Sequence, residues 1–212
     1  MDEDPKKIVK EAYDHIAEWY LSWVDGQPSP RERYALKLLL QNPLSPAPRI
    51  LELGCGPGIP ITRLLLDRGA QVVANDISTQ QLNLARARCP QATFVPDDMT
   101  VLCFEPASFD GVVSFFTLFH LPRAEQRDMF ARICSWLKPG GMFVFNLATV
   151  DEEAIYGEML GHGMFWSSYG VGESMAMVEG VGLEVVEAEV LESEPDGGVK
   201  FVWVVARRGV AG

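Results

Sequence analysis

The sequence predicts an α/β fold, a doubly wound and mostly parallel sheet with helices on both faces. Between residues 49 and 148, five apolar runs of strand length alternate with segments whose apolar residues recur at helical spacing. The C-terminal region breaks this alternation, because the strand-like runs LEVVEAEVLE and VKFVWVVARR are joined by SEPDGG. Asp-Gly is a strong hairpin signal. We therefore expect seven strands in all, the last two forming an antiparallel C-terminal hairpin.

The first five predicted strands are apolar runs flanked by turn residues: RILELG (49–54), AQVVAND (70–76), ATFVP (92–96), FDGVVSFFTLF (109–119) and MFVFNLA (142–148). Helices are predicted between them, over residues 60–68, from Ser78 to about Cys89, and over 123–137. Pro60 suits the first turn of its helix, where a missing N–H costs nothing. Ser78 and Gln81 have the spacing of a capping box. LKPGG (137–141) is predicted as a turn.

The whole chain, residues 1–212, is expected to form one domain. Residues 1–43 are predicted as an N-terminal helical cap of two helices, followed by the Pro-rich linker NPLSPAPR. Residues 48–150 are the predicted ligand-binding core. Residues 151–170 lack a regular pattern and are interpreted as an insertion or lid. Residues 171–208 are expected to hold a helix and the C-terminal hairpin.

Composition limits the possible partners. The chain has 29 acidic and 18 basic residues, a net charge of −11, which disfavours binding to nucleic acid. Its four cysteines are scattered without a CxxC pair, as expected of reduced thiols. The N-terminus is charged and does not resemble a secretory signal, and the longest apolar run, Val112–Leu121, is too short to span a membrane. We expect a cytoplasmic protein, monomeric or homodimeric, without a membrane partner.

A glycine-rich loop follows the first strand, with Gly54, Gly56 and Gly58 at every second position. Glycines here let the backbone approach a ligand closely, and the following helix directs its N–H groups at the same place. Asp76 ends the second strand 20 residues after Gly56 (76 − 56), where a carboxylate can accept hydrogen bonds from ribose hydroxyls. The pattern predicts a nucleotide site. The GxGxG spacing and the antiparallel C-terminal strands disfavour a nicotinamide-dependent dehydrogenase.

Several stretches resemble motifs of the class I S-adenosylmethionine-dependent methyltransferases. ELGCGPG looks like their glycine loop, VVANDIS like their second-strand acidic motif, and FVPDDM like their adenine-contacting loop. FDGVVSFFTLFHL and WLKPGG are similar to their fourth strand and to the turn before their fifth. The resemblance implies a Rossmann-like seven-stranded fold and S-adenosyl-L-methionine as cofactor, with S-adenosyl-L-homocysteine as product.

The resemblance also implies roles for individual residues. Gly54, Gly56 and Gly58 would pack against the cofactor's methionine part and ribose, and Asp76 would bind the ribose hydroxyls. Asp98 would accept a hydrogen bond from the adenine amino group, although the neighbouring Asp97 leaves this choice to spacing alone. Glu52 either serves the cofactor or caps loop amides. The full set of expected cofactor residues is Glu52, Gly54, Gly56, Gly58, Asp76, Ile77, Asp98, Met99, Tyr13 and Phe115.

His120 and Tyr20 are the candidate catalytic residues. His120 follows the fourth strand, where a base near the transferred methyl group would stand; the alternative is a histidine that only hydrogen-bonds the loop. Tyr13 and Tyr20 lie seven residues apart on one helix face, which suits a lid over a sulfonium and equally suits core packing. Phe165, Trp166 and Tyr169 are the candidate walls of an acceptor pocket.

Missing motifs narrow the acceptor. There is no [ND]PP[YFW] after the fourth strand, no Pro-Cys nucleophile and no Asp–Asp–Asn metal set. The sequence therefore favours metal-independent methyl transfer to a small molecule by in-line displacement, at an O, N or C atom. No metal site is expected. The alternative is an S-adenosylmethionine-binding protein on the same fold that does not methylate, either a regulatory protein or a lyase- or cyclase-like enzyme.

Overall fold

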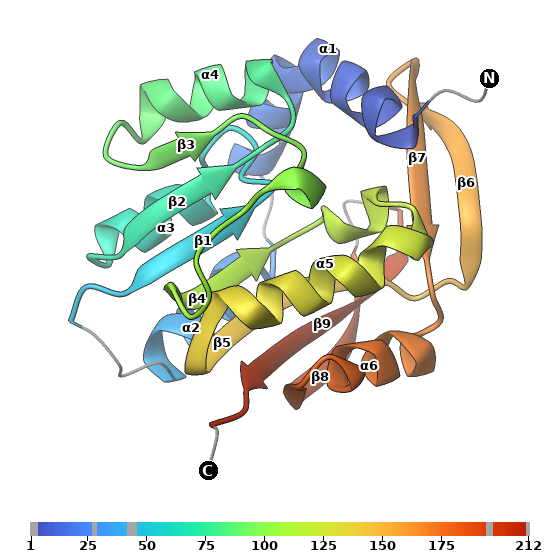
Figure 1. The fold of residues 1–212 in the computed structure, drawn as a ribbon. Helices are drawn as coiled ribbons and strands as arrows, with labels where there is room; N and C mark the ends of the chain where they lie inside the picture. Colours follow the sequence, from blue (N-terminus) through green and yellow to red (C-terminus); the bar gives the residue numbers. More distant parts are fainter. Residues whose placement is uncertain (1–3, 27–28, 42–45, 194–196, 211–212) are drawn as a thin grey trace.

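The structure is a computed structural model that describes residues 4–26, 29–41, 46–193 and 197–210. A seven-stranded sheet with the order β3-β2-β1-β4-β5-β9-β8 forms its centre (Figure 1). Its strands are β1 (Arg49–Leu53), β2 (Gln71–Asn75), β3 (Thr93–Val95), β4 (Phe109–Ser114), β5 (Leu137–Ala148), β8 (Leu183–Ser193) and β9 (Val199–Arg208). The helices are α1 (Pro5–Gly26), α2 (Arg31–Gln41), α3 (Ile61–Asp67), α4 (Thr79–Arg88), α5 (Arg123–Trp136), α6 (Val171–Gly180) and the short 3-10 helices η1 (Met99–Val101) and η2 (Leu118–His120).

The predicted fold class is confirmed. Strands β1 to β5 pair in parallel, whereas β9 pairs antiparallel with both β5 and β8. The turn expected at SEPDGG lies partly outside the described residues. LKPGG is not a separate turn: it forms the start of β5, and the register of β5 against β4 shifts there. Gly140, at φ +79°, supplies the conformation that this irregular stretch needs.

Alternating side chains of the sheet face two apolar cores. On one face, Leu51 and Phe143 pack with Phe130 of α5 and Val178 of α6. On the other, the sheet packs against α2, α3 and α4. This period of two, with apolar residues on both faces, is the pattern of a strand covered by helices on both sides. Among the described residues, no helix is both long and apolar enough to cross a membrane.

Residues 152–159 and 162–168, where the sequence shows no regular pattern, form two strands. They form an antiparallel hairpin of β6 (Glu152–Met159) and β7 (His162–Ser168), separate from the main sheet. β6 is exposed along most of its length, so it carries no alternation of apolar and polar residues that would reveal a strand. The hairpin packs against α1 through an apolar cluster that includes Val9, Ala12, Met164 and Phe165.

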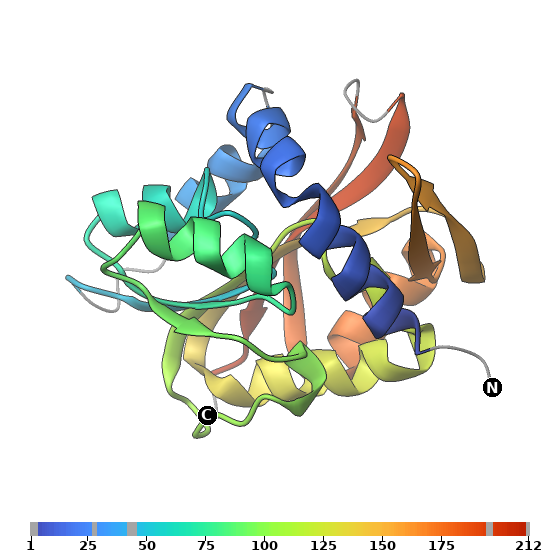
Figure 2. The same cartoon turned by 90° about the horizontal axis from the view of Figure 1, so that it is seen from above.

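The hairpin and α1 lie over the carboxyl ends of the parallel strands. Figure 2, seen from above, shows α1 crossing the molecule between α4 and the hairpin. The sheet order reverses between β1 and β4, and in open α/β sheets ligands bind outside the carboxyl ends at such a point. This fold therefore places the loops after β1 and β4 beneath α1.

Candidate active site

The loop after β1 is fitted closely to its surroundings. Gly54 and Gly56 have φ of +71° and +55°, conformations that favour glycine. A Cβ on Gly54 would lie 2.1 Å from Oγ1 of Thr117, which follows β4. Gly58 differs from the other two, because its Cβ would meet the backbone of Ala85 on α4 at 3.1 Å. Gly54 and Gly56 line the cavity above the loop, whereas Gly58 brings the loop against α4 and is absent from the lining.

Asp76 connects the loop to the next helix. Its Oδ2 accepts a hydrogen bond from the Gly56 N–H at 2.8 Å, and its Oδ1 accepts one from the Ser78 N–H at 2.9 Å. Burial raises the pKa of this carboxyl to about 6, against the opposing effect of these two bonds. Each carboxylate oxygen can accept a second hydrogen bond, so the side chain keeps capacity for a ligand.

Glu52 lies beneath the same loop and is buried. Its Oε2 accepts a hydrogen bond from Oγ1 of Thr62 on α3 at 2.6 Å, so its bond goes to a side chain and not to a loop amide. Burial raises the pKa of Glu52 to about 8. Glu52 is therefore largely protonated near neutral pH.

One cavity collects most of the predicted cofactor residues at the carboxyl edge of the sheet. Asp98 lines it, and its carboxylate is held by the N–H of Thr100 at 2.8 Å and by Nζ of Lys6 at 2.9 Å. Asp97 is exposed and does not line the cavity, so the structure separates these two neighbours where spacing could not. The predicted residues that line this cavity are Gly54, Gly56, Asp76, Ile77, Asp98, Met99, Tyr13, Tyr20, Phe115 and His120.

Gln81 also lines the cavity, and the sequence interpretation missed it. Its side chain is 1% exposed, and neither the Oε1 nor the Nε2 atom has a hydrogen-bond partner. The expected capping box is only half formed: Oγ of Ser78 accepts from the Gln81 N–H at 3.1 Å, while the Ser78 N–H is used by Asp76. A buried amide without a partner is costly, which points to a polar ligand group in the cavity.

A second cavity, of about 320 Å³, adjoins the first between α1, the hairpin and β9. Its walls are mostly apolar, with Trp166 and Phe119 among them. Tyr13, Tyr20, Phe116 and His120 line both cavities. These four side chains therefore stand where a molecule in one cavity would meet a molecule in the other.

Trp166 lines the second cavity, but Phe165 and Tyr169 do not. Successive residues of a strand point to opposite sides, so Phe165 on β7 packs into the cluster between the hairpin and α1. Tyr169 follows the end of β7 and packs against the core beside α5. The structure thus places two of the three predicted wall residues outside the cavity.

His120 is held by two neighbours. Its Nδ1 lies 2.8 Å from the carbonyl oxygen of Phe165 and its Nε2 lies 3.3 Å from the Tyr13 hydroxyl. A carbonyl can only accept, so Nδ1 carries the proton and Nε2 is left as the acceptor. Burial lowers the pKa of His120 to about 4. The imidazole is therefore neutral near pH 7, with the unprotonated Nε2 at the region that the two cavities share.

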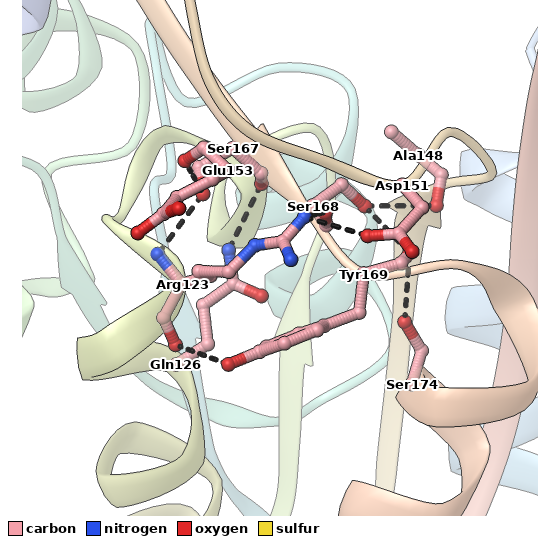
Figure 3. A network of polar contacts seen from close by, with 9 residues as sticks. All are labelled: Arg123, Gln126, Ala148, Asp151, Glu153, Ser167, Ser168, Tyr169 and Ser174. Carbon is pink, nitrogen blue, oxygen red and sulfur yellow. Dashed lines mark hydrogen bonds and ion pairs between the residues drawn. The ribbon is translucent and has the colours of Figure 1, made fainter.

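A polar network fixes the base of the hairpin against α5 and α6 (Figure 3). The backbone N–H of Arg123 donates to Oγ of Ser167 at 2.9 Å. The Arg123 guanidinium donates from Nη2 to Oδ1 of Asp151 at 2.7 Å, and its Cζ lies 4.4 Å from the ring centre of Tyr169. Nε2 of Gln126 donates to the Ser167 carbonyl at 2.9 Å. These bonds fix the C-terminal end of β7, which carries Trp166.

These residues fit an adenosine-containing cofactor. Asp76 offers a carboxylate for ribose hydroxyls, and Gln81 offers an amide that the chain itself leaves unpaired. Met99 and Phe115 supply apolar contacts for a flat ring. Among the described residues, no group of three or more His, Cys, Asp or Glu side chains is placed to hold a metal ion.

The site and fold define a nucleotide-cofactor enzyme of the α/β class, and comparisons identify the family. Residues 50–141 match the family model described as a methyltransferase domain. The chain is 36% identical over 125 residues to trans-aconitate 2-methyltransferase of Variovorax paradoxus (strain S110). The aligned region covers 58% of this chain and 47% of that protein. The comparisons place residues 50–141 in the class I S-adenosylmethionine-dependent methyltransferases.

Solved structures share the fold. Magnesium protoporphyrin IX methyltransferase from Synechocystis PCC 6803, with bound S-adenosylmethionine, aligns with a TM-score of 0.76 at 16% identity, over 98% of this chain and 99% of that one. The [4+2]-cyclase SpnF aligns with a TM-score of 0.70 at 17% identity, over 95% of each chain. The chain spans about half or less of the length of the curated relatives it matches first.

Proposed function

We propose that the protein transfers a methyl group from S-adenosylmethionine to a small-molecule acceptor by in-line displacement, without a metal ion. The observation that carries this proposal is the pair of adjoining cavities that share Tyr13, Tyr20, Phe116 and His120. In-line transfer needs donor and acceptor aligned across such a boundary. The polar edge of the first cavity suits a nucleotide cofactor, and the apolar walls of the second suit an organic acceptor.

When bound, the cofactor supplies a methyl group on a positively charged sulfur. The chain's own residues would bind and align the two molecules. Asp76 and Gln81 accept and donate hydrogen bonds at the ribose side, while α1 covers the site and excludes water. Tyr20 and Tyr13 place aromatic rings at the boundary, 5.5 Å apart in an edge-on arrangement, where they attract positive charge.

We propose His120 as the base for acceptors that must lose a proton. Its Nε2 is the unprotonated nitrogen, and the Phe165 carbonyl fixes the ring in this tautomer. The Tyr13 hydroxyl, 3.3 Å from Nε2, occupies this acceptor position and would yield it to an acceptor O–H or N–H. Tyr20 is proposed to position the cofactor end of the reaction rather than to move a proton.

A small-molecule acceptor is supported by the relatives' names. One is a trans-aconitate methyltransferase, and another, from Oryza sativa subsp. japonica, is a 24-methylenesterol C-methyltransferase. A non-methylating enzyme is the second candidate, because a protein described as a [4+2]-cyclase shares the fold.

The test is a search for labelled products. The protein is incubated with a metabolite extract and S-adenosylmethionine carrying a trideuterated methyl group, and products are found by mass spectrometry. We expect at least one metabolite to gain the labelled methyl group, and the Asp76→Asn protein to yield far less of it. Binding of S-adenosylhomocysteine without any labelled product would favour the non-methylating alternative.

A further inference from the structure

Arg31, the first residue of α2, is a buried cation in the lining of the second cavity (the acceptor cavity). Only 6% of its surface is exposed. It lines the acceptor cavity together with Trp23 and Phe116, and it lines a smaller hollow beside Glu52 and the glycine loop. The sequence reasoning did not select it, because a lone arginine at a helix start is usually solvated.

The contacts of Arg31 orient its guanidinium but do not neutralise it. Nη2 donates to the Tyr20 hydroxyl at 3.3 Å, and Cζ lies 4.5 Å from the ring centre of Phe116 and 5.8 Å from that of Trp23. The Nε atom is buried and has no hydrogen-bond partner. Within the part of the chain that the structure describes, no carboxylate forms an ion pair with Arg31.

The neighbouring acid does not supply the missing charge. Glu52 is near enough to influence Arg31 electrostatically, but burial raises its pKa to about 8 and its Oε2 is already bonded to Thr62. A buried charge without a partner is costly, and a guanidinium fork matches a carboxylate in a bidentate geometry. The buried Arg31 guanidinium therefore lacks an anionic partner from the described part of the chain.

The other polar groups of the acceptor cavity have partners within the chain. Ser167 and Ser168 donate to the Glu153 and Ala148 carbonyls, and His120 is engaged at both nitrogens. Arg31 is the one charged side chain in the lining of this cavity among the described residues. The cavity thus combines aromatic walls with a single cation.

We propose that Arg31 binds a carboxylate in the active site, and that the acceptors are largely apolar, flat molecules that carry one such group. This inference rests on the proposed function, since it names the acceptor class of that site. The amino-acid end of the cofactor also carries a carboxylate and is the other molecule that could provide it. The contacts of Arg31 with two rings of the acceptor cavity favour the acceptor.

The test compares ligand pairs that differ only in the anionic group, by calorimetry on the wild-type protein and on Arg31→Met. For the acceptor cavity, the probes are 2-naphthoate and 2-naphthamide, measured with the protein saturated in S-adenosylhomocysteine. For the cofactor, the probes are S-adenosylhomocysteine and 5′-methylthioadenosine, which lacks the amino-acid end. Arg33→Met, at an exposed position on the same helix, is the control, and Arg31→Lys keeps the charge without the fork.

We expect the wild-type protein to bind naphthoate at least tenfold more tightly than naphthamide. Arg31→Met should remove this preference and leave the naphthamide affinity within twofold, while Arg31→Lys keeps part of it and Arg33→Met all of it. A tenfold loss of S-adenosylhomocysteine affinity, with 5′-methylthioadenosine unchanged, would support a carboxylate at Arg31 and assign it to the cofactor.

The proposal is overturned if neither pair shows a carboxylate preference that depends on Arg31. It is also overturned if Arg31→Met weakens all four probes equally, because that result indicates a structural role. Thermal melting of each variant shows whether it folds. Failure of the wild-type protein to bind S-adenosylhomocysteine is a different result, which would refute the proposed function itself.

Discussion

The Nδ1 atom of His120 lies 2.8 Å from the carbonyl oxygen of Phe165, so a residue of η2 is fixed by the hairpin β6–β7. The same hairpin carries Trp166, which faces the acceptor cavity. One strand therefore sets the tautomer of the proposed base and supplies a wall for the proposed acceptor. The relationship links the hairpin between β5 and α6 to the segment that follows β4.

The buried, neutral state of His120 predicts a pH-dependent contribution to stability. Its pKa is lowered from 6.5 to about 4, so the unfolded chain takes up a proton first as the pH falls. The stability due to neutral burial is present above pH 6.5 and is lost between pH 6.5 and 4. We expect a loss of about 2 kcal/mol between pH 7.5 and pH 5.

His120→Asn isolates this effect, because an amide can still donate to the Phe165 carbonyl but does not titrate. Glu52 and Asp76 have raised pKa values, so their contribution to stability increases as the pH falls, opposite to that of His120. Both residues are present in wild type and variant, so their contributions cancel in the comparison. Urea unfolding at several pH values measures the difference in unfolding free energy between wild type and variant. A difference that stays constant from pH 7.5 to pH 5 would contradict the neutral burial of His120.

Asp76→Asn is expected to weaken S-adenosylhomocysteine binding by about 10- to 100-fold, as for the loss of a charge-assisted hydrogen bond of about 1.5–3 kcal/mol. Asparagine is a better replacement than alanine, because the Asp76 carboxylate also accepts hydrogen bonds from the Gly56 and Ser78 N–H groups. The asparagine amide oxygen can still accept one of these two bonds. Calorimetry measures the affinity. Asp97→Asn, at an exposed position, is the control and should bind as the wild type does; equal affinities for all three proteins would refute the assignment.

The sequence predicted what depends on local patterns. Gly54 and Gly56 follow a buried strand, and Asp76 ends the next one, so their meeting at one sheet edge could be inferred from strand order alone. Gly58 belongs to the same glycine motif, but its role depends on how closely α4 approaches the loop, and residue spacing does not reveal that distance. Local patterns thus give the position of a loop and not the partner of each residue in it.

The remaining site residues depend on packing between distant segments. Arg31 and Gln81 look like solvated residues at helix starts, yet packing between distant segments buries both, and Arg31 lies against Tyr20 of α1 and Phe116 after β4. Phe165 and Trp166 are adjacent in the sequence, and only the strand conformation of 162–168 sends one to the core and the other to the cavity. The hairpin itself was hidden because β6 has little burial to impose an alternating pattern.

Gln81→Met should separate binding from stability. Methionine keeps the length of the side chain and removes two buried polar atoms that have no partner in the chain. We expect the unfolding free energy without ligand to rise by about 1 kcal/mol, because an unsatisfied amide no longer has to be buried. Affinity for S-adenosylhomocysteine should fall by about 5- to 20-fold, the equivalent of one or two neutral hydrogen bonds.

Gln80→Met is the matched control, since Gln80 is exposed beside it on α4. Denaturant unfolding and calorimetry on the three proteins give both quantities. If Gln81→Met binds S-adenosylhomocysteine as tightly as wild type, the amide does not serve the cofactor, and its lack of partners has another cause.

Helix α1 and the hairpin are expected to respond together to the cofactor. Lys6, Val9 and Tyr13 on one face of α1 line the cofactor cavity, and Val9 also packs on Met164 and Phe165 in the hairpin. A ligand beneath α1 adds contacts to this face, so local opening of the helix becomes less frequent. Hydrogen exchange should slow in α1 and in β7 when S-adenosylhomocysteine is added, while exchange in α6, on the opposite side of the sheet from α2, α3 and α4, should be unchanged.

A variant tests whether the two segments are coupled. Val9→Ala removes two buried methyl groups, worth about 1.5 kcal/mol, from the cluster that joins α1 to the hairpin. We expect faster exchange in both segments without ligand and a smaller response in β7 when ligand is added. Glu18→Ala, at an exposed position on α1, should leave both unchanged. If α1 responds to the ligand but β7 does not, in wild type as in Val9→Ala, the hairpin is a fixed wall of the acceptor cavity and α1 alone closes over the cofactor.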